Sequence, residues 1–530
     1  MFTRCFFFFP WLTLTAASVA AQPFDDCVLT TLIEGGTVYN GHGSEPVTVD
    51  IGILGARIAA IGDLKSCESE VRLTATGLIV VPGFIDIHSH GTRGVFRFPL
   101  AENLTRQGVT TAIGGPDGSS PNPIGSYLAR LDAEPSAVNF GLMVGHGTIR
   151  RDVMGNEDRR PSVIELDMMK AMVERAMKEG AFGLSSGLKY VPGAYAETTE
   201  VIELARVSGS FGGIYISHMR EEGLQLLDAV RETIMIGEEG NLPVQITHHK
   251  VVGAPMWGRS VDSLALIDTA RSRGVDVTLD QYPYTAASTN LSVLFPSWSL
   301  EGSRVDLLAR LEDSEQRERI KNGIIATLRD DRGGNDPRNV VVAQCDWDPT
   351  LDGMNLAEIL TVQDRPVNLA AAAELTMELQ VEGDCSGIFH AMSEEDVRRI
   401  MQYPYTMIAS DGGILAPGEG VPHPRNYGTF ARVLGHYSRN LGVLNFSEAI
   451  RKMTSLPASR LGLIDRGVIE VGAYADVAVL DQKTINDQAV FTKPHQYATG
   501  AKHVFVNGVA VILNGEATGN RPGHALRNNR

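Results

Sequence analysis

The middle of this 530-residue chain repeats one pattern eight times. An apolar stretch of strand length is followed by an amphipathic stretch of helical length, which is typical of a parallel α/β fold. The spacing of His218 and His248 also fits one strand–helix step of a barrel of about 250 residues. The pattern therefore predicts a (β/α)8 TIM-like barrel, with candidate strands GFIDIHSH, GVTTAIGG, VNFGLMVGH, GAFGLSSG, GGIYISH, LPVQITH, GVDVTLDQYP and YTMIASDG.

The two ends of the chain differ from its middle. Short β-rich runs with Gly and Asn turns occupy residues 22–81 and 466–530, and they predict a small β-sandwich built from both chain ends. The barrel is then expected over residues 82–465. Residues from about 295 to 400 are too many for one strand–helix step, so we expect an insertion between strands 7 and 8.

Polar residues stop most of the predicted strands. Residues two positions apart point the same way on a strand, so His88 and His90 of VPGFIDIHSH lie side by side. Two protonated imidazoles would repel each other, and a shared cation removes that conflict. One such pair could equally be a solvated and a hydrogen-bonded histidine. The signal is the whole set at the strand ends, where barrel sites lie: His88, His90, Asp117, His146, Lys189, His218, His248 and Asp411.

This residue set suits metal-assisted hydrolysis. Neutral imidazole and carboxylate are good zinc ligands, and zinc lowers the pKa of bound water toward about 7, which makes hydroxide available as a nucleophile. Hydrolysis also needs a base that accepts a proton and returns it to the leaving group. Asp411 of IASDGG ends the last strand, before two glycines that leave room for a substrate. We interpret it as the general base, with a helix or turn cap as the alternative.

Six segments together resemble a known family. PGFIDIHSH, GLSSGLKYVPGAYA, YISHMR, ITHHK, SDGG and HPRNYGTFARVLG occur in this order, and the likeness runs from about residue 27 to the C-terminal GNRPGHALR. The set resembles the amidohydrolase superfamily and, within it, the N-acyl-D-amino-acid deacylases, or D-aminoacylases. The HxH pair alone is a weak signal, whereas the ordered set is specific.

The resemblance implies a hydrolase with one or two Zn²⁺ ions that cleaves the amide of N-acylated D-amino acids. It implies metal ligation by His88, His90, His218, His248 and Asp411, with His249 as a neighbour. It also implies that Lys250 and Tyr190, and more loosely Tyr282, bind the substrate carboxylate. An ammonium and two phenols would give one charge-assisted and two neutral hydrogen bonds. Each tyrosine could instead simply pack in the core.

One position departs from the resemblance. Typical relatives carry a cysteine metal ligand after the second strand, where GVTTAIGGPDGSS has Asp117. A carboxylate can ligate zinc directly. Alternatively, a carboxylated Lys189 could bridge two ions, as a lysine does in other amidohydrolases, or Lys189 could be a surface ammonium or a substrate clamp. The sequence leaves these alternatives open.

Two other classes of function are compatible with parts of the sequence. A dipeptidase or cyclic-amide hydrolase would use the same metal chemistry, and a metal-free binding or assembly barrel is a third class. The net charge of −16 argues against nucleic acid or an anionic membrane as a partner. We expect a small N-acyl amino acid or peptide-like amide as the partner.

The N-terminus predicts a secretory signal over residues 1–21. One arginine precedes the apolar run CFFFFPWLTLT, and the small residues of AASVAAQ offer a cleavage site after Ala20 or Ala21. A short membrane anchor is the alternative, although the run is shorter than the roughly twenty apolar residues that span a bilayer. We therefore expect a secreted or periplasmic protein without a membrane partner after cleavage.

Four cysteines remain after the predicted cleavage site, and an oxidising compartment would favour disulfides. Four cysteines allow three pairings. Cys27 and Cys67 both precede strands of the predicted sandwich, so we expect them to pair. Cys345 and Cys385 both lie in the predicted insertion.

Overall fold

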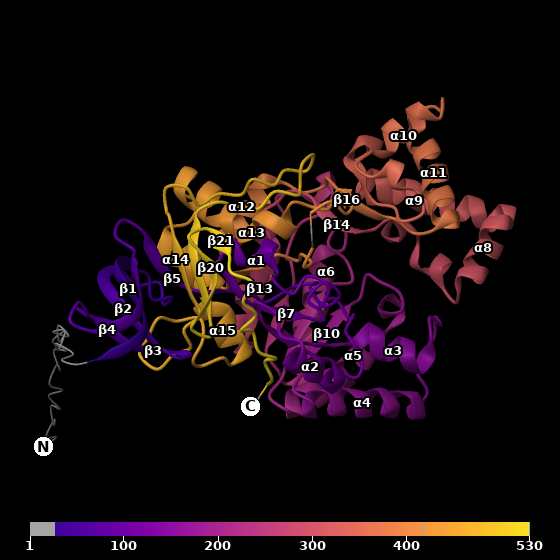
Figure 1. Cartoon of the computed structure of the whole chain (residues 1–530). Helices are drawn as coiled ribbons and strands as arrows, with labels where there is room; N and C mark the ends of the chain where they lie inside the picture. The colour runs from indigo at the N-terminus through magenta and orange to yellow at the C-terminus, as the bar shows by residue number, and fades with distance from the viewer. Residues whose placement is uncertain (1–26, 416, 529–530) are drawn as a thin grey trace, which may run out of the picture.

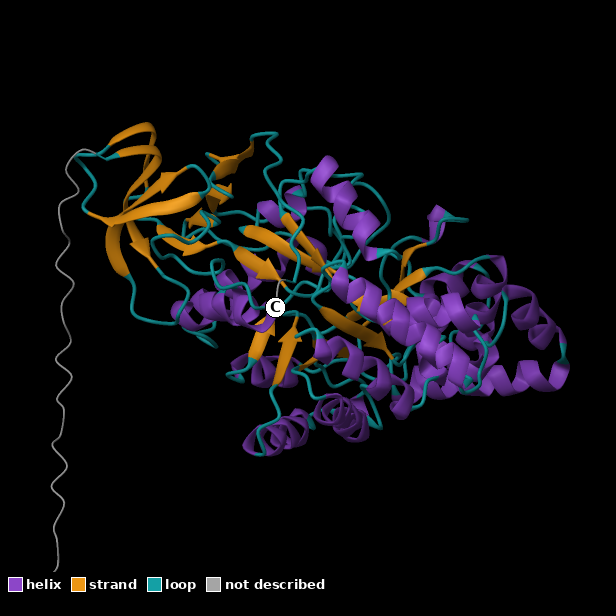
Figure 2. Cartoon of the chain, turned by 90° about the horizontal axis from the view of Figure 1, so that it is seen from below, coloured by secondary structure: helices purple, strands orange, loops and turns teal. Residues whose placement is uncertain are grey.

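The computed structural model describes residues 27–415 and 417–528, so the predicted signal lies outside the described residues. A β/α barrel occupies the centre of the molecule. A β-rich unit lies at one end of the barrel and a largely helical insertion at the other (Figures 1 and 2). The predicted fold class is confirmed. None of the described helices has both the length and the apolar character needed to cross a membrane.

The β-rich unit is one hydrogen-bonded sheet drawn from both ends of the chain. β5 and β18 join the two halves, with Val80 opposite Val479 in antiparallel register. Strands from both chain ends share a core, because Ile58 of β3 and Phe505 of β19 are buried in the same cluster. Its strands are β1 (Val28–Val38), β2 (Val47–Leu54), β3 (Arg57–Gly62), β4 (Glu68–Thr74), β5 (Ile79–Pro82), β18 (Val477–Leu480), β19 (Ala501–Val506), β20 (Val509–Leu513) and β21 (Glu516–Ala517).

The barrel strands follow the eight predicted segments. They are β6 (Phe84–Asp86), β7 (Val109–Gly114), β8 (Asn139–Leu142) with its continuation β9 (Val144–Gly145), β10 (Gly183–Gly187), β11 (Ile214–His218), β12 (Val244–Ile246), β13 (Val277–Gln281) and β17 (Thr406–Ile408). Neighbouring strands pair in parallel. The ring closes beyond β17, where the Asp411 amide donates to the His88 carbonyl at 2.9 Å.

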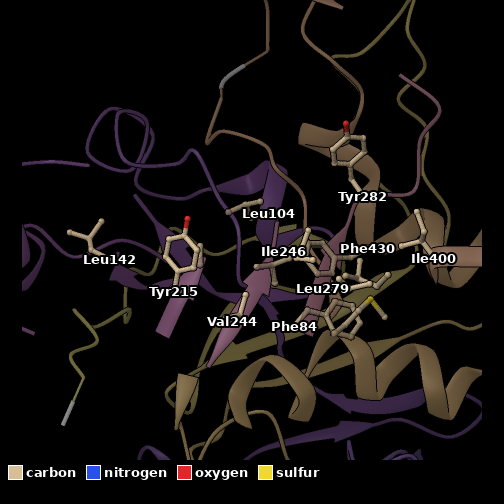
Figure 3. Packing of buried hydrophobic residues seen from close by; sticks show 14 of the residues in the cluster. Phe84, Leu104, Leu142, Tyr215, Val244, Ile246, Leu279, Tyr282, Ile400 and Phe430 are labelled. Atoms are coloured by element: carbon tan, nitrogen blue, oxygen red, sulfur yellow. The ribbon is translucent and has the colours of Figure 1, made fainter. Parts of the chain in front are cut away.

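Helices cover the outside of the barrel, and its strands are buried, as parallel strands require. Phe84, Val244, Ile246, Leu279 and Phe430 illustrate the close packing between strands and helices (Figure 3). The helices are α1 (Glu102–Thr105), α2 (Ile124–Ala133), α3 (His146–Met154), α4 (Val163–Lys178), α5 (Thr198–Ser210), α6 (Leu226–Gly240), α7 (Ser260–Ser272), α12 (Glu394–Gln402), α13 (Arg425–Arg432), the π-helix η7 (Val433–Asn440), α14 (Phe446–Met453) and α15 (Ser455–Leu461).

The insertion after β13 has its own sheet, helices and core. Its first strand begins at Ala287, earlier than the expected start near residue 295, because β14 pairs with β16. Near its end, α12 packs against α7 and β17 and so belongs to the barrel. The elements are β14 (Ala287–Asn290), β15 (Val340–Gln344), β16 (Ser386–Phe389), α8 (Arg304–Glu312), α9 (Ser314–Asp330), α10 (Leu356–Val362) and α11 (Leu369–Glu382).

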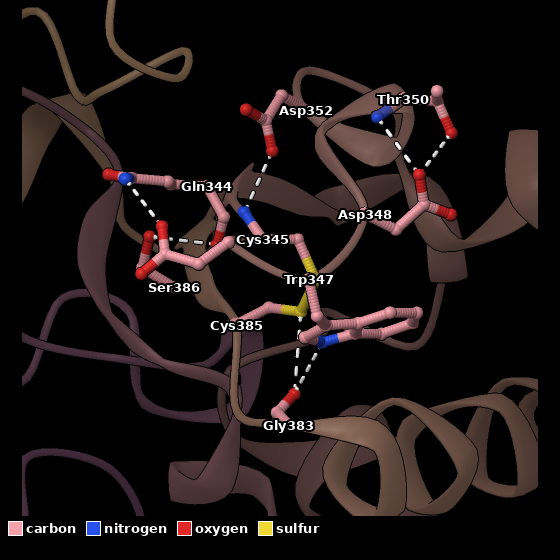
Figure 4. The surroundings of a disulfide bond; sticks show 10 residues. Gln344, Cys345, Trp347, Asp348, Thr350, Asp352, Gly383, Cys385 and Ser386 are labelled. Carbon is pink, nitrogen blue, oxygen red and sulfur yellow. Dashed lines mark hydrogen bonds between the residues drawn. A yellow bond between two sulfur atoms is a disulfide. The ribbon is translucent and has the colours of Figure 1, made fainter.

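Two disulfides lie outside the barrel. Cys27 is bonded to Cys67, which confirms the expected pair, and Cys345 is bonded to Cys385 at the edge of the inserted sheet. The indole of Trp347 lies beside the second disulfide (Figure 4) and donates to the Gly383 carbonyl at 2.7 Å. Each bond joins two residues 40 positions apart in the sequence.

Candidate metal centre

Six side chains from five barrel strands converge at the carboxyl ends of those strands. They form two groups whose ligand atoms lie within 4.8 Å of one another, and Asp117 belongs to both. The first group is His88, His90, Asp117 and Asp411, and the second is Asp117, His218 and His248. The parallel barrel brings these residues together because the carboxyl ends of all its strands meet at one rim.

The first group surrounds the ring nitrogens of the HxH pair. His90 Nε2 lies 3.3 Å from Asp117 Oδ2 and 3.1 Å from Asp411 Oδ1. His88 Nε2 lies 3.4 Å and 3.5 Å from the same two oxygens. The two imidazoles of the first strand therefore face two carboxylates, one from the second strand and one from the last.

The second group lies beside both oxygens of Asp117. His248 Nε2 lies 3.4 Å from Asp117 Oδ1 and 2.7 Å from His218 Nδ1. His218 Nδ1 lies 3.9 Å from Asp117 Oδ2. The Asp117 carboxylate thus lies between the two groups, with Oδ2 beside histidines of both and Oδ1 beside His248. It occupies the position that a bridging ligand of a two-metal site needs.

The electrostatics of the first group favour a cation. Burial opposes the charged form of His88, but Asp117, Asp280 and Asp411 outweigh it and raise the His88 pKa well above its usual value. Both ring nitrogens of His88 are buried and have no hydrogen-bond partner among the described residues. A buried polar atom without a partner costs about 1–3 kcal/mol. Imidazole and carboxylate are donors that fit zinc, and a bound zinc ion would give the buried His88 nitrogen a partner.

Three of these six residues have an unusual backbone conformation, which directs their side chains. Asp117, His248 and Asp411 have positive φ angles of 53°, 34° and 50°. Non-glycine residues rarely adopt this region, and such strain clusters at functional sites. Next to Asp117, a Cβ on Gly118 would lie 2.7 Å from the Gly187 amide nitrogen, so only glycine lets the second-strand loop approach β10 this closely.

Lys189 and His146 lie outside the two groups. Lys189 Nζ contacts Glu221 at 2.8 Å and Asp331 at 3.5 Å. A carboxylated Lys189 would place a third negative charge beside these two, so the arrangement favours an ammonium there and favours Asp117 as the bridging ligand. His146 Nε2 contacts Glu200 at 2.8 Å behind the rim. Both residues follow strand ends as predicted, but their side chains pair with glutamates outside the two groups.

A cavity of about 990 Å³ opens above the metal centre. The three predicted substrate-binding residues Tyr190, Lys250 and Tyr282 line it, together with His90, His218, His248, Asp117 and Asp411. Burial keeps the pKa of Tyr190 and of Tyr282 above the usual value, so both phenols are donors. The insertion contributes part of the wall, including Phe295 and Arg332.

Four charged residues at the site were not predicted from the sequence. Arg425 Nη1 donates to Asp411 Oδ2 at 2.8 Å, and Asp280 lies 3.5 Å from His88 Nδ1. Burial raises the pKa of Asp411, but Arg425 and His88 outweigh it and hold that pKa well below its usual range. Glu222 and Arg332 form a buried pair behind the second group. Two signals were available in the sequence: Glu222 lies four residues after a predicted ligand, and Arg425 lies in the segment HPRNYGTFARVLG.

A closed parallel barrel with a histidine–carboxylate centre at its carboxyl rim and a sheet made from both chain ends defines a metal-dependent amidohydrolase. The family model described as "Amidohydrolase family" matches residues 388–512. The chain is 37% identical to D-aminoacylase from Alcaligenes xylosoxydans xylosoxydans, and the alignment covers 96% of this chain and 98% of that protein. The chain therefore belongs to the D-aminoacylase family.

Solved structures agree with this assignment. A D-aminoacylase with a binuclear metal centre superposes with a TM-score of 0.81 at 36% identity, covering 94% of this chain and 100% of the other. N-acyl-D-glutamate deacylase from Bordetella bronchiseptica, complexed with zinc and a phosphonate inhibitor, also gives a TM-score of 0.81, at 33% identity and 94% and 99% coverage. The fold of this chain is that of its family, whose solved structures hold a binuclear metal centre or zinc.

Proposed function

We propose that the protein is a zinc-dependent deacylase that hydrolyses the amide bond of N-acyl-D-amino acids. The observation that carries this proposal is the double histidine–carboxylate group on the floor of a cavity that also holds Lys250. The activities named for its relatives, D-aminoacylase and N-acyl-D-glutamate deacylase, support the substrate class.

Asp411 is placed to move the proton that amide hydrolysis requires. Bound zinc, held by the two groups, would supply Lewis acidity that activates water and polarises the amide carbonyl. Arg425 holds one oxygen of Asp411 and leaves the other facing His90. The ionised carboxylate accepts a proton from the attacking water and gives it to the amide nitrogen as the C–N bond breaks. The products are a carboxylic acid and a free amino acid.

Lys250, Tyr190 and Tyr282 are proposed to bind the substrate carboxylate. The Tyr190 ring packs on His218 with 4.5 Å between ring centroids, and Lys250 Nζ lies 5.7 Å from the Tyr282 ring. A hydrogen bond to a charged group contributes about 1.5–3 kcal/mol, so Lys250→Met should raise KM by about 10–100-fold. An unchanged KM with N-acetyl-D-amino acids would remove Lys250 from this role.

A hydrolysis screen tests the proposed reaction. Zinc-loaded and metal-stripped enzyme would be assayed with paired N-acetyl-D- and N-acetyl-L-amino acids, dipeptides and cyclic amides. We expect zinc-dependent release of the D-amino acid with little release of its L counterpart. Turnover restricted to dipeptides or cyclic amides would replace the proposal with one of those activities. Zinc-independent turnover would refute it.

We also propose that the protein is exported to the periplasm or secreted. The charged, apolar and small-residue order of the N-terminal segment supports this location, and so do the two disulfides, which form in oxidising compartments. N-terminal sequencing of protein recovered outside the cytoplasm should begin after Ala20 or Ala21. A full-length cytoplasmic product would refute export.

A further inference from the structure

Glu222 lies behind both histidines of the second group. It follows β11 in the chain, and its side chain is only 1% exposed. Its Oε1 lies 3.1 Å from His248 Nδ1 and 2.5 Å from Lys250 Nζ. Its Oε2 lies 3.6 Å from His218 Nε2. One buried carboxylate thus faces, on each ring, the nitrogen that points away from Asp117.

This placement bears on how the two rings can bind a metal. A metal at His248 Nε2 requires the proton to sit on Nδ1. Two groups lie beside Nδ1, namely Glu222 and the Lys250 ammonium at 2.5 Å, and only the carboxylate can accept that proton. A carboxylate behind a metal-binding histidine fixes its tautomer and ring orientation.

The insertion supplies the partner that holds Glu222. Arg332, just beyond α9, is 1% exposed, and its Nη2 donates to Glu222 Oε2 at 3.2 Å. The preceding residue, Asp331, contacts Lys189, which in turn holds Glu221. Glu221 Oε1 accepts the backbone amides of Glu222 and Gly223 at 3.0 and 3.1 Å. Two consecutive insertion residues therefore fix both the side chain and the backbone of Glu222.

The contact between insertion and barrel is also sterically tight at this point. Gly253, in the loop after the His248 strand, has a φ of 87°, and a Cβ there would lie 2.4 Å from the Asp330 carbonyl oxygen. The end of α9 is therefore held directly against a loop of the barrel rim. This leaves little room for Arg332 to move away from Glu222.

We propose that Glu222 is a positioning residue for His218 and His248, and that Arg332 makes the insertion part of the second metal site. The inference rests on the proposed function only in treating these two histidines as metal ligands. Without Arg332, Glu222 Oε2 loses the arginine that holds it beside His218, and only Oε1 stays fixed, through Lys250. Loss of an outer partner of a metal ligand typically costs 10–100-fold in metal affinity.

Zinc affinity, measured without any substrate, tests the proposal. Glu222→Gln, Arg332→Met and Arg332→Lys would be stripped and titrated with zinc against a chromophoric chelator, and their cobalt-substituted spectra would be recorded. Arg329→Met is the matched control, because Arg329 lies near the end of the same helix, is half-exposed and pairs with Asp330 alone among the described residues. We expect one zinc site to weaken by about 10–100-fold in Glu222→Gln and Arg332→Met. Arg332→Lys should recover part of this loss, and the control should match wild type.

The possible outcomes separate the two parts of the inference. Wild-type zinc affinity in both Glu222→Gln and Arg332→Met would overturn it. Zinc loss in Glu222→Gln alone would keep the role of Glu222 and refute that of the insertion. Equal loss in Arg329→Met would show a general effect of the helix and refute both. If Glu222→Gln does not fold, the two Arg332 variants decide. Failure of the deacylase assay would leave these zinc measurements unaffected.

Discussion

Removing the carboxylate of Asp117 should prevent the protein from holding two zinc ions at once. Asp117 Oδ2 lies 3.3 Å from His90 Nε2, and Oδ1 lies 3.4 Å from His248 Nε2. In Asp117→Ala the first group falls from four candidate ligands to three, and the second from three to two. The second group should therefore lose its ion first.

The size of the effect follows from charge. Two unit charges 4 Å apart repel by about 4 kcal/mol at an effective dielectric constant of 20, and two divalent ions repel about four times as strongly. Paired metals in two-metal sites lie about 3.5–4 Å apart. An anion between them offsets this repulsion, and the two histidines left in the second group cannot replace its charge. We expect Asp117→Ala to bind at most one zinc ion.

Metal content after dialysis, measured by atomic emission together with zinc titration, checks this expectation. Lys189→Met is the matched control, because Lys189 lines the same cavity but contacts Glu221 and Asp331. Lys189→Met should keep the metal stoichiometry of the wild type, with affinity within about tenfold, since it removes no ligand. Two bound zinc ions in Asp117→Ala, or greater metal loss in Lys189→Met than in Asp117→Ala, would refute the reasoning.

His218→Ala and His248→Ala should each abolish zinc-supported activity while far-UV circular dichroism stays native, and near wild-type turnover with bound zinc would exclude the residue as a ligand. Asp411→Asn should retain part of its zinc yet lose turnover by at least about 100-fold, the contribution of a general base; a small loss of kcat would remove Asp411 from proton transfer. Replacing Cys345 and Cys385 by serine removes a disulfide that joins two residues 40 positions apart in the sequence. On the chain-entropy model this should lower the insertion's free energy of unfolding by about 4 kcal/mol, and an unchanged denaturant midpoint would contradict that estimate.

Much of the fold was readable because the relevant signals are local. Strand-length apolar runs, helical periodicity and turn residues depend on neighbouring positions, so the eight barrel strands and the two-ended sheet followed from the sequence. The limits of the insertion were less clear. Its first strand, β14, is short and mixed in polarity, and it is a strand because it pairs with β16, almost a hundred residues later.

The candidate ligands could also be named early, because a parallel barrel brings every strand end to one rim whatever the loops do. That rule named eight strand-end residues, and the family resemblance narrowed the implied ligands to His88, His90, His218, His248 and Asp411, all of which lie in the two groups. Arg332 and Arg425 gave no such signal. Arg332 is one arginine among many, and its role depends on Glu222, 110 residues earlier in the chain. Arg425 lies in the segment HPRNYGTFARVLG, but its contact with Asp411 depends on the path of the chain between them.

The choice between Asp117 and Lys189 shows where sequence and tertiary structure divide. The sequence determined that both residues stand at strand ends of the same barrel and that either could supply an anionic bridging ligand. The tertiary structure decided where their side chains point. A left-handed backbone at Asp117 turns its carboxylate between the two histidine pairs, and Glu221 with Asp331 draws the Lys189 ammonium away. Side-chain direction in a loop depends on contacts between segments that are remote in sequence, and no local pattern records those contacts.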